Sequence, residues 1–438
     1  MEGLGISDED EARLAEEISV VFHAAATINF QEPMRVAVNL NILGTKRVVN
    51  LAKKMTKLKA FVHVSTAYGN CHLPEINEEM YPSPIDPAKL IQMTEWLDDD
   101  MLESLTAKLV HPRPNTYTYT KALAEHVLVT DGCNLPVVII RPAIVCGSWK
   151  EPTPGWVDNM FAFTGLLIGM GKGFLRSLYI KNGIKLDFIP VDVAINLMIT
   201  TAWNTDVKQY IHKSPVPIYC ASTGSQLPLT IEKLDEILRE TVWKVPLDSP
   251  LWFPDGSAKT SKFVHNLHVL LVNIIPAYIG DLVLRLLGKK PIAMKLTNRM
   301  IKAINALEYF MLHDWTFSNV NVRNLWTSLS PIDQQAFHFD ISDLNWKEYI
   351  ENYQMGCKKF IMKEELSSLP TAKRTLRILY WLHRLAQLVM AYAAWCVVSS
   401  DSATCIYSGF ISGASYCLSM APVLAAAEEA ADPALTSS

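Results

Sequence analysis

The chain lacks the cysteine pattern of a secreted or zinc-binding protein. Its eight cysteines are scattered, with no CxxC pair and no regular framework. This spacing argues for a reducing compartment rather than for a disulfide-stabilised fold. His63 and His72 have no spaced cysteine or carboxylate partner, so we interpret both as packing or surface residues and predict no metal site.

Charge is also sparse. Charged residues make up 19% of the 438 residues, the formal net charge is −4, and the sequence contains no basic patch. We therefore expect no nucleic-acid partner. The first residues, MEGLGISDEDEARLAEEI, are acidic and lack the apolar core of a signal peptide. Half of all residues are hydrophobic, which suffices for a large core and two or three domains.

Three apolar runs predict parallel strands of one sheet. They are ISVVFHAAAT at 18–27, the run at 60–66, and LPVVIIRPAIV at 135–145. Helical patterns over 32–55 and from about 117 to 130 separate these runs, so the sequence predicts βαβ units and an α/β fold. We expect the first run to be a buried strand. The three alanines at its end either leave room for a flat ring or a ribose over the strand tip, or they form a tightly packed junction between strand and loop.

Tyr117 and Lys121 lie four residues apart on the second predicted helix. Residues i and i+4 share one face of a helix, so the ammonium can lower the pKa of the phenol and still reach a ribose. Such a tyrosine can protonate a carbonyl oxygen as hydride reaches the carbon. Chance alone could supply this pair, but the flanking strands place it where open α/β sheets bind ligands.

Further polar residues accompany this pair. Asn41 lies in the middle of the first predicted helix, where a buried amide needs partners. It either holds a water that relays protons to Lys121 or is capped or faces solvent. Ser65 and Thr66 end the second strand at the same sheet edge. A hydroxyl there can stabilise an oxygen on which negative charge develops.

Beyond about residue 228 the pattern turns mainly helical. Residues 265–287 are strongly apolar but interrupted by Pro276, Asp281 and Arg285. We expect a helical hairpin that is buried or dips into a membrane surface, with a soluble core pair as the competing interpretation. Residues 385–398 are also apolar, but they are shorter than the roughly 20 residues of a span and predict at best a marginal anchor.

Several segments together resemble one known family. They are VVFHAAATINFQEP, NLNILGTKRVVNLAKKM, LKAFVHVSTAYGNC, PNTYTYTKALAEHV, VVIIRPAIV and GWVDN, and the block at 288–365 adds LEYF, WTFSNVN and FDISDLNWKEYI. With these motifs the chain resembles the alcohol-forming fatty acyl-CoA reductases of the extended short-chain dehydrogenase/reductase superfamily. The resemblance implies a partial doubly wound parallel sheet of the Rossmann type, followed by a mainly helical domain.

The resemblance also implies roles for single residues. Tyr117 would be the proton donor, and Lys121 would bind the nicotinamide ribose and lower the pKa of Tyr117. Thr66 would orient the substrate carbonyl, with Ser65 as the less favoured candidate, and Asn41 matches the superfamily's helix asparagine. The remaining expected cofactor contacts are Ala24, Ala25, Ala26, Pro142, Ala143 and Ile144.

The implied reaction is the NADPH-dependent reduction of a long-chain fatty acyl-CoA to the alcohol through a bound aldehyde. We expect a membrane-associated, cytosol-facing protein of the endoplasmic reticulum or the peroxisome. The sequence leaves open whether the chain forms a homo-oligomer. The expected domains are a reductase domain with an incomplete cofactor-binding part at 1–262, a helical domain at 263–366 and a hydrophobic, membrane-associated tail at 367–438.

One family motif is not found in this sequence. The glycine-rich GxxGxxG turn, which holds a pyrophosphate at a helix N-terminus, has no counterpart, and Gly3 and Gly5 read as loop. We therefore expect the chain to match the family from about its fourth strand, to expose apolar sheet edges, and to bind NADPH poorly or not at all. Three explanations for the missing turn stay open: a fragment, a mispredicted gene model and a degenerate isoform. The segment after 399 does not resemble the family either. The alternative function is a catalytically dead, membrane-associated acyl-binding or regulatory homologue.

Overall fold

The computed structural model describes residues 3–208, 215–393 and 395–396. Met1–Lys373 form one compact unit, and Arg374–Ser438 belong to a second. The described part of the second unit is helical over 374–393. The apolar run predicted at 385–398 extends past the described residues, and the segment after 399 lies outside them, so both predictions stay open.

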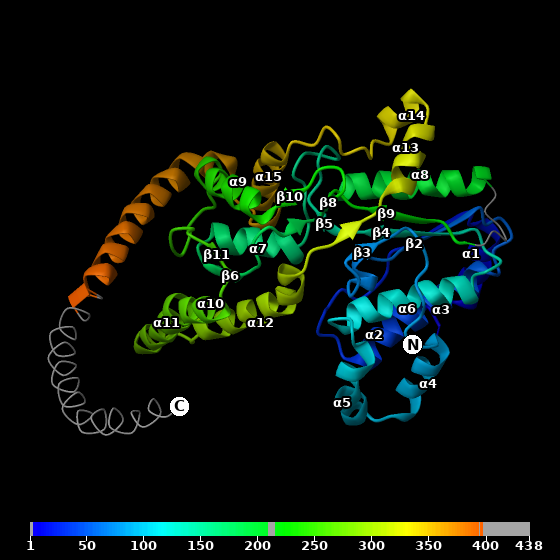
Figure 1. Cartoon of the computed structure of the whole chain (residues 1–438), viewed down its shortest axis with the longest axis horizontal. Helices are drawn as coiled ribbons and strands as arrows, with labels where there is room; N and C mark the ends of the chain where they lie inside the picture. The colour runs from blue at the N-terminus through cyan, green and yellow to red at the C-terminus, as the bar shows by residue number, and fades with distance from the viewer. Residues whose placement is uncertain (1–2, 209–214, 394, 397–438) are drawn as a thin grey trace, which may run out of the picture. The chain divides into compact units, whose positions relative to one another are not determined.

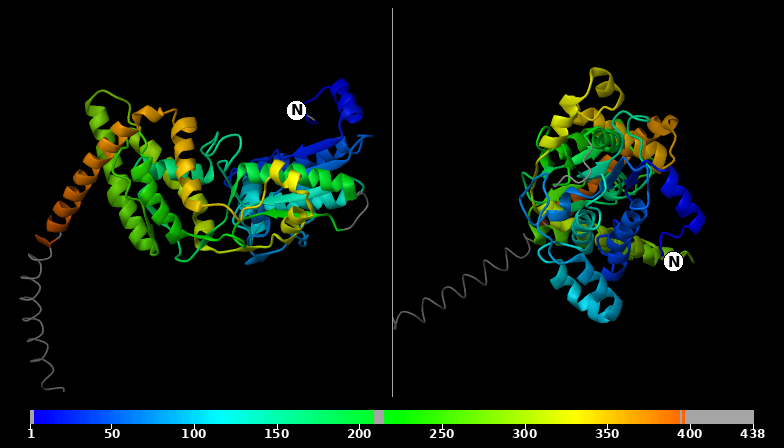
Figure 2. Two further views of the ribbon diagram at one scale, coloured as in Figure 1. Left: turned by 90° about the horizontal axis from the view of Figure 1, so that it is seen from above. Right: turned by 90° about the vertical axis from the view of Figure 1, so that its right-hand side faces the viewer.

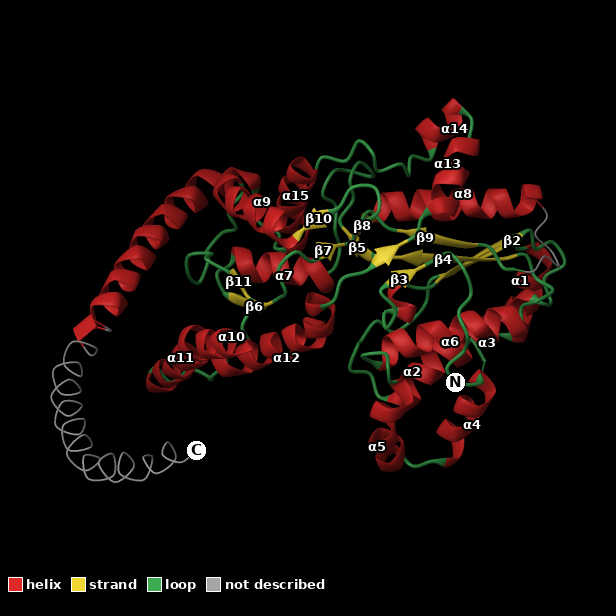
Figure 3. Ribbon diagram, viewed as in Figure 1, coloured by secondary structure: helices red, strands yellow, loops and turns green. Residues whose placement is uncertain are grey.

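A parallel sheet of four strands forms the centre of the first unit (Figure 3). His23 lies opposite His63, and Pro142 lies opposite Ala221, so the carboxyl ends of the strands meet at one edge. The strands in spatial order are β1 (Val20–His23), β2 (Ala60–Val64), β4 (Val137–Pro142) and β9 (Ile218–Ala221).

Helices cover both faces of this sheet (Figures 1 and 2). On one face, α3 (Gly44–Ala52) and α6 (Thr116–Thr130) pack against alternate strand residues, and on the other α8 (Val191–Lys208) and α13 (Val320–Ser328) do so. Strand β4 is buried along its whole length, as expected for a strand covered on both faces. The predicted α/β fold of the Rossmann type, with α6 connecting two parallel strands, is confirmed.

Strand β1 differs from its prediction. Val20 and Phe22 are 38% and 46% exposed, so the expectation of a buried first strand is wrong for these positions. Among the described residues, β1 is the edge of the sheet and pairs with β2 alone, which leaves one side of it uncovered. The predicted exposure of apolar residues at a sheet edge is thereby confirmed.

Short elements complete the first unit. Four pairs of short strands are β3 (Glu75–Ile76) with β12 (Thr316–Phe317), β5 (Ile144–Cys146) with β8 (Phe188–Pro190), β6 (Ser177–Tyr179) with β11 (Ser257–Lys259), and β7 (Lys185–Leu186) with β10 (Leu229–Thr230). Further helices are α1 (Asp8–Glu17), α4 (Pro87–Trp96), α5 (Asp99–Val110), α7 (Ala162–Gly171), α9 (Ile231–Lys244), α14 (Pro331–Ala336) and α15 (Trp346–Gly356).

The strongly apolar segment forms one long helix rather than the predicted hairpin. Its parts are α10 (Lys262–Val269), the π-helical turn η3 (Leu270–Ile274) and α11 (Ile275–Leu286). Pro276 lacks the N–H that an α-helix needs, and the wide turn directly before it lets the helix continue. The hairpin partner is instead α12 (Ala293–Leu312), which lies beside this helix (Figures 1 and 2).

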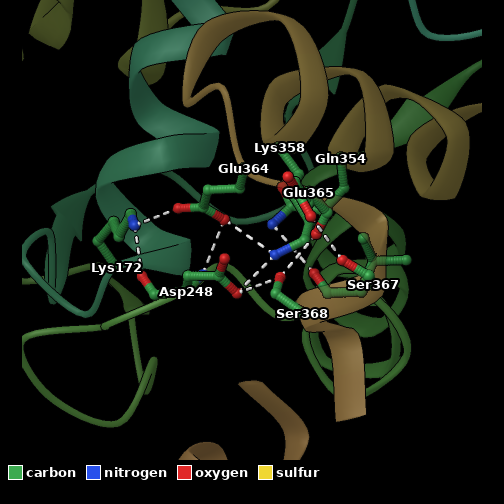
Figure 4. A network of polar contacts seen from close by, with 9 residues as sticks. Lys172, Asp248, Gln354, Lys358, Glu364, Glu365, Ser367 and Ser368 are labelled. Atoms are coloured by element: carbon green, nitrogen blue, oxygen red, sulfur yellow. Dashed lines mark hydrogen bonds and ion pairs between the residues drawn. The ribbon is translucent and has the colours of Figure 1, made fainter. Parts of the chain in front are cut away.

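A buried polar network holds the end of α15 in place (Figure 4). The fully buried Lys358 donates to Asp248 at 2.7 Å and to Glu364 at 3.0 Å, and Lys172 donates to Glu364 at 2.6 Å. Ser368 donates to the same Asp248 oxygen at 2.8 Å. A buried ammonium is tolerated only when it is paired in this way. The network therefore joins the chain near residue 360 to the loop that contains Asp248.

Two glycines share a left-handed backbone but differ in their surroundings. Gly155 has a φ of 78°, and a Cβ there would collide with the carbonyl oxygen of Asn352. We expect Gly155→Ala to lower the free energy of unfolding by about 2–5 kcal/mol, because it adds a collision to a left-handed backbone. Gly183 has a similar φ of 74° in open space, so Gly183→Ala should cost about 1–2 kcal/mol. Urea unfolding measures both, and equal losses would contradict the packing argument.

Candidate active site at the carboxyl edge of the sheet

The predicted site residues gather where the parallel strands end. Ala24 follows β1, Ser65 and Thr66 follow β2, and Ala143 follows β4. The strand register places these positions at one edge of the sheet. Open α/β sheets bind their ligands at this edge. The predicted residues therefore lie at one edge of the sheet, and their roles stay predictions.

Tyr117 lies in the first turn of α6, where the side chain of Asn115 caps the helix. Its ring is half-buried and stacks on Phe30, with the ring centroids 5.5 Å apart at 28°. Burial raises the pKa of Tyr117, and a hydrogen bond with the Thr66 side chain offsets part of the increase. The predicted lowering of the Tyr117 pKa by Lys121 is therefore wrong for this arrangement, in which burial dominates.

Lys121 reaches toward β2. Its Nζ donates to the carbonyl oxygen of Val64 at 2.6 Å and lies 3.4 Å from Nε2 of His63. The side chain is buried, and this burial lowers the pKa of Lys121 to about 8, while the charge of Glu125 acts in the opposite direction. The ammonium thus has polar partners behind the end of β2, one helical turn beyond Tyr117.

A pair of buried histidines extends this arrangement. The Nδ1 atoms of His23 and His63 are 2.9 Å apart, so one nitrogen donates a proton to the other. Burial and the nearby Lys121 lower the pKa of His23 to about 4 and that of His63 well below its usual value. Both rings are therefore neutral near pH 7. His63, which we interpreted from sequence as a packing or surface residue, belongs to a polar chain from Lys121 to β1.

Asn41 lies in the π-helical segment η1 (Val38–Leu43) and is buried, which excludes the solvent-facing interpretation. Its Oδ1 accepts from the backbone N–H of Thr27 at 2.9 Å, and its Nδ2 donates to Thr120 at 2.9 Å. The amide is thus satisfied by protein groups on a loop and on α6. A water relay from Asn41 to Lys121 stays a prediction.

The two hydroxyls after β2 differ in their partners. Thr66 accepts from the backbone N–H of Tyr68 at 3.3 Å, and its side chain also hydrogen-bonds with Tyr117. The Ser65 hydroxyl is buried and has no hydrogen-bond partner among the described residues. A buried unpaired hydroxyl is costly unless a ligand satisfies it. Ser65, the less favoured candidate from sequence, therefore has an unused hydroxyl at the candidate site.

The predicted cofactor contacts fall into two groups. Ala24 and Ala25 are exposed after β1, and Ala26 is partly exposed, so this strand tip is accessible to a ligand. Pro142 and Ala143 are buried at the end of β4, where the Ala143 N–H donates to Ala221. Ile144 begins β5 and is partly buried.

Aromatic residues that the sequence interpretation did not single out surround Tyr117. Phe30 stacks on Tyr117 and also contacts Phe310 of α12, with centroids 5.2 Å apart. Tyr68 meets Phe310 edge-on at 5.3 Å. These side chains form an apolar wall next to the phenol. Phe30 and Phe310 occur in the segments INFQEP and LEYF, which carried the family resemblance but suggested no role.

The chain is similar to known proteins over most of its length. Two family models, both described as male sterility protein, match residues 1–198, as an NAD-binding region, and residues 272–364. Fatty acyl-CoA reductase 2 of Mus musculus is 44% identical over 390 residues, which cover 89% of this chain and 75% of the relative. The chain belongs to the fatty acyl-CoA reductase family. Fatty acyl-CoA reductase 1 of Xenopus laevis is 39% identical over 411 residues, covering 91% of this chain and 79% of the relative.

A solved structure supports the fold of this fatty acyl-CoA reductase family member. The terminal R domain of the myxalamid PKS-NRPS biosynthetic pathway aligns with a TM-score of 0.51 and 17% identity, covering 81% of this chain and 71% of that one. At this identity the likeness concerns the fold alone. The resemblance inferred from the sequence motifs is confirmed by the family matches.

Proposed function

We propose that this chain reduces a long-chain fatty acyl-CoA to the fatty alcohol with NADPH, through a bound aldehyde, and that it does so slowly because the glycine-rich turn that holds the pyrophosphate has no counterpart in its sequence. The observation that carries the proposal is the position of Tyr117 at the carboxyl edge of the sheet, where its ring stacks on Phe30 and the buried Lys121 lies one helical turn away. A phenol and an ammonium thus lie near the apolar wall of Phe30 and Phe310. Membership of the fatty acyl-CoA reductase family supports the substrate class.

The residues at the strand ends fit a nicotinamide cofactor. The exposed Ala24 and Ala25 leave the tip of β1 accessible, and the unpaired Ser65 hydroxyl can bond to a ligand oxygen. We propose that Ala24, Ala25 and Ala26 hold the dinucleotide and that Lys121 binds its ribose. When bound, the cofactor supplies hydride. The protein supplies orientation and the proton.

Tyr117 has the same task in both reductions. In the first, the thioester carbon gains hydride, and its oxygen takes a proton from Tyr117 while Thr66 and Ser65 orient it. The carbon–sulfur bond of the resulting hemithioacetal then breaks, so that CoA leaves as the thiol and an aldehyde stays bound. The second reduction requires that NADP+ is exchanged for a second NADPH and that Tyr117 regains a proton from solvent. The aldehyde carbon then gains hydride, and Tyr117 supplies the alcohol proton.

The proposed location is a cytosol-facing membrane surface of the endoplasmic reticulum or the peroxisome. Among the described residues, one helix, Lys262–Leu286, is long and apolar enough to cross a membrane by length and composition. Such a helix also suits a surface that meets a lipid substrate. Association into a homo-oligomer belongs to the same proposal.

The test is product analysis with palmitoyl-CoA and either NADPH or NADH. Formation of hexadecanol with NADPH, and less with NADH, supports the proposal. Acyl-CoA binding without any turnover, measured by equilibrium dialysis, supports instead the alternative of a dead acyl-binding or regulatory homologue. A chain that neither binds nor reduces palmitoyl-CoA overturns both.

The pH dependence should follow Lys121. Because burial lowers its pKa to about 8, kcat/KM should fall as pH rises through about 8 and the ammonium is lost. Stability should show the opposite trend, since between about pH 8 and the ordinary lysine pKa the unfolded chain binds a proton that the folded chain does not. Lys121→Arg stays charged and should lack the decline in its pH profile. A wild-type profile that is flat across pH 8 would contradict this assignment.

A further inference from the structure

The long helix Lys262–Leu286 directs three of its polar residues toward the protein. Buried His265 shares a hydrogen bond with Ser177 at 2.8 Å, and buried Asn273 donates to the carbonyl oxygen of Phe174 at 2.8 Å. Buried Asp281 accepts from the first N–H groups of α12 at 2.8 and 3.1 Å. The inner side of this helix is therefore polar along most of its length.

The outer side of the same helix is apolar. Large side chains there are more than half exposed, and only 17% of the most apolar part of the helix is buried. This is the reverse of a helix on the surface of a water-soluble domain, whose apolar stripe faces the core. A contiguous exposed apolar surface of this kind marks an interaction site. Its most exposed members are Phe263, Leu271, Tyr278, Ile279, Leu282 and Leu286.

Basic residues surround one end of this apolar face. Six of them are exposed, and within the described residues none forms a salt bridge. Between positions 270 and 307 the only acidic residue is Asp281, which is buried and bonded to α12. The local charge is therefore strongly positive and favours a negatively charged partner. The six are Arg285, Lys289, Lys290, Lys295, Arg299 and Lys302.

We propose that this face binds the surface of an anionic lipid bilayer and that the helix lies in the membrane interface without crossing it. Apolar side chains flanked by lysine and arginine are the combination that binds such interfaces. The proposal deepens the membrane association proposed above, and it is independent of the reductase chemistry because neither substrate nor cofactor is involved.

The hydrogen bonds of the inner side argue against a spanning helix. The bonded positions from His265 to Asp281 extend over about 24 Å at 1.5 Å per residue. Crossing the bilayer would break these bonds and leave the polar groups in hydrocarbon, where unsatisfied groups are costly. The same bonds leave the apolar side free to enter one leaflet.

The experiment uses the full chain with a probe on the proposed face. Leu282→Cys is labelled with the fluorophore NBD in a chain whose Cys133, Cys396, Cys405 and Cys417 are replaced by serine. Leu282 is 57% exposed, so this change should not disturb folding. The matched control carries the label at Ile332→Cys on α14, which is 79% exposed and lies outside the basic cluster. A local probe separates this face from any binding by the apolar C-terminal segment.

We expect the Leu282 probe to shift to shorter wavelength with vesicles of phosphatidylcholine and phosphatidylserine, and the Ile332 probe to stay unchanged. Quenchers placed shallowly in the bilayer should act more strongly than quenchers at its centre. The double variant Lys289→Glu, Lys290→Glu should weaken this binding by at least about tenfold, and added salt should do the same.

Three results would overturn the proposal. Vesicles that capture the chain without changing the Leu282 probe would assign membrane binding to another segment. Strongest quenching from the centre of the bilayer would mean that the helix spans it. A shift of the Leu282 probe that appears without lipid as the protein concentration rises would identify the face as a contact between copies of the chain.

Discussion

Replacing Tyr117 by phenylalanine is expected to lower kcat for acyl-CoA reduction by about 10²- to 10⁴-fold, the range of a lost general acid. The phenylalanine ring keeps the stack on Phe30, so the KM for acyl-CoA and the melting temperature should change little. The reason is that the hydroxyl bonded to Thr66 is the group that would give its proton to the substrate oxygen. Steady-state kinetics with palmitoyl-CoA measures the effect.

Tyr119 supplies the matched control for this experiment. It lies on the same helix and is buried against the core formed with Met34 and Leu123. Tyr119→Phe removes a phenol hydroxyl away from the proposed site and should leave kcat within about twofold, as expected for a group outside the reacting geometry. If both variants lose activity equally, or if Tyr117→Phe keeps full activity, the proton-donor role is refuted.

Local sequence patterns predicted on which elements several candidate residues lie, because these patterns are short-range. Tyr117 and Lys121 share a helix, and the strand ends that contain Ser65 and Thr66 follow from hydrophobic runs. The pairing of His23 with His63 could not be read in this way, since these residues are 40 apart in sequence and meet only through the register of β1 and β2. The direction of the Tyr117 pKa was missed because it depends on burial and on the path of the Lys121 side chain.

The error at 265–287 has a similar origin. Pro276 and Asp281 were interpreted as interruptions of an apolar run, which favoured a helical hairpin. The π-helical turn before Pro276 instead keeps the helix continuous, and Asp281 caps the next helix through the N–H groups of Ala293 and Met294. The continuous helix at Pro276 depends on an adjustment of the backbone before it, and the burial of Asp281 depends on partners in α12. Hydropathy along the apolar run alone could reveal neither.

Removing one partner of the buried pair Arg141–Glu125 is expected to lower the free energy of unfolding by about 3–5 kcal/mol. Arg141 of β4 holds the Glu125 carboxylate of α6 with two hydrogen bonds of 2.9 and 2.7 Å, and both side chains are almost inaccessible. Arg141→Met leaves a buried carboxylate without its charge partner. The exposed pair Lys233–Glu236 has a similar distance of 2.8 Å, so Lys233→Met should cost less than about 1 kcal/mol in the same urea titration.

The same pair should also control the pH dependence of the proposed reaction. The negative charge of Glu125 favours the protonated form of Lys121 and so raises its pKa against the effect of burial. Glu125→Gln keeps the size of the side chain but removes that charge, so the decline in kcat/KM should begin below about pH 8. The double variant Arg141→Met with Glu125→Leu should recover most of the stability, because an apolar contact replaces the ion pair. It should keep the shifted decline in kcat/KM, because the charge of Glu125 is still absent. A double variant with wild-type pH dependence would contradict the assignment of the decline to Lys121.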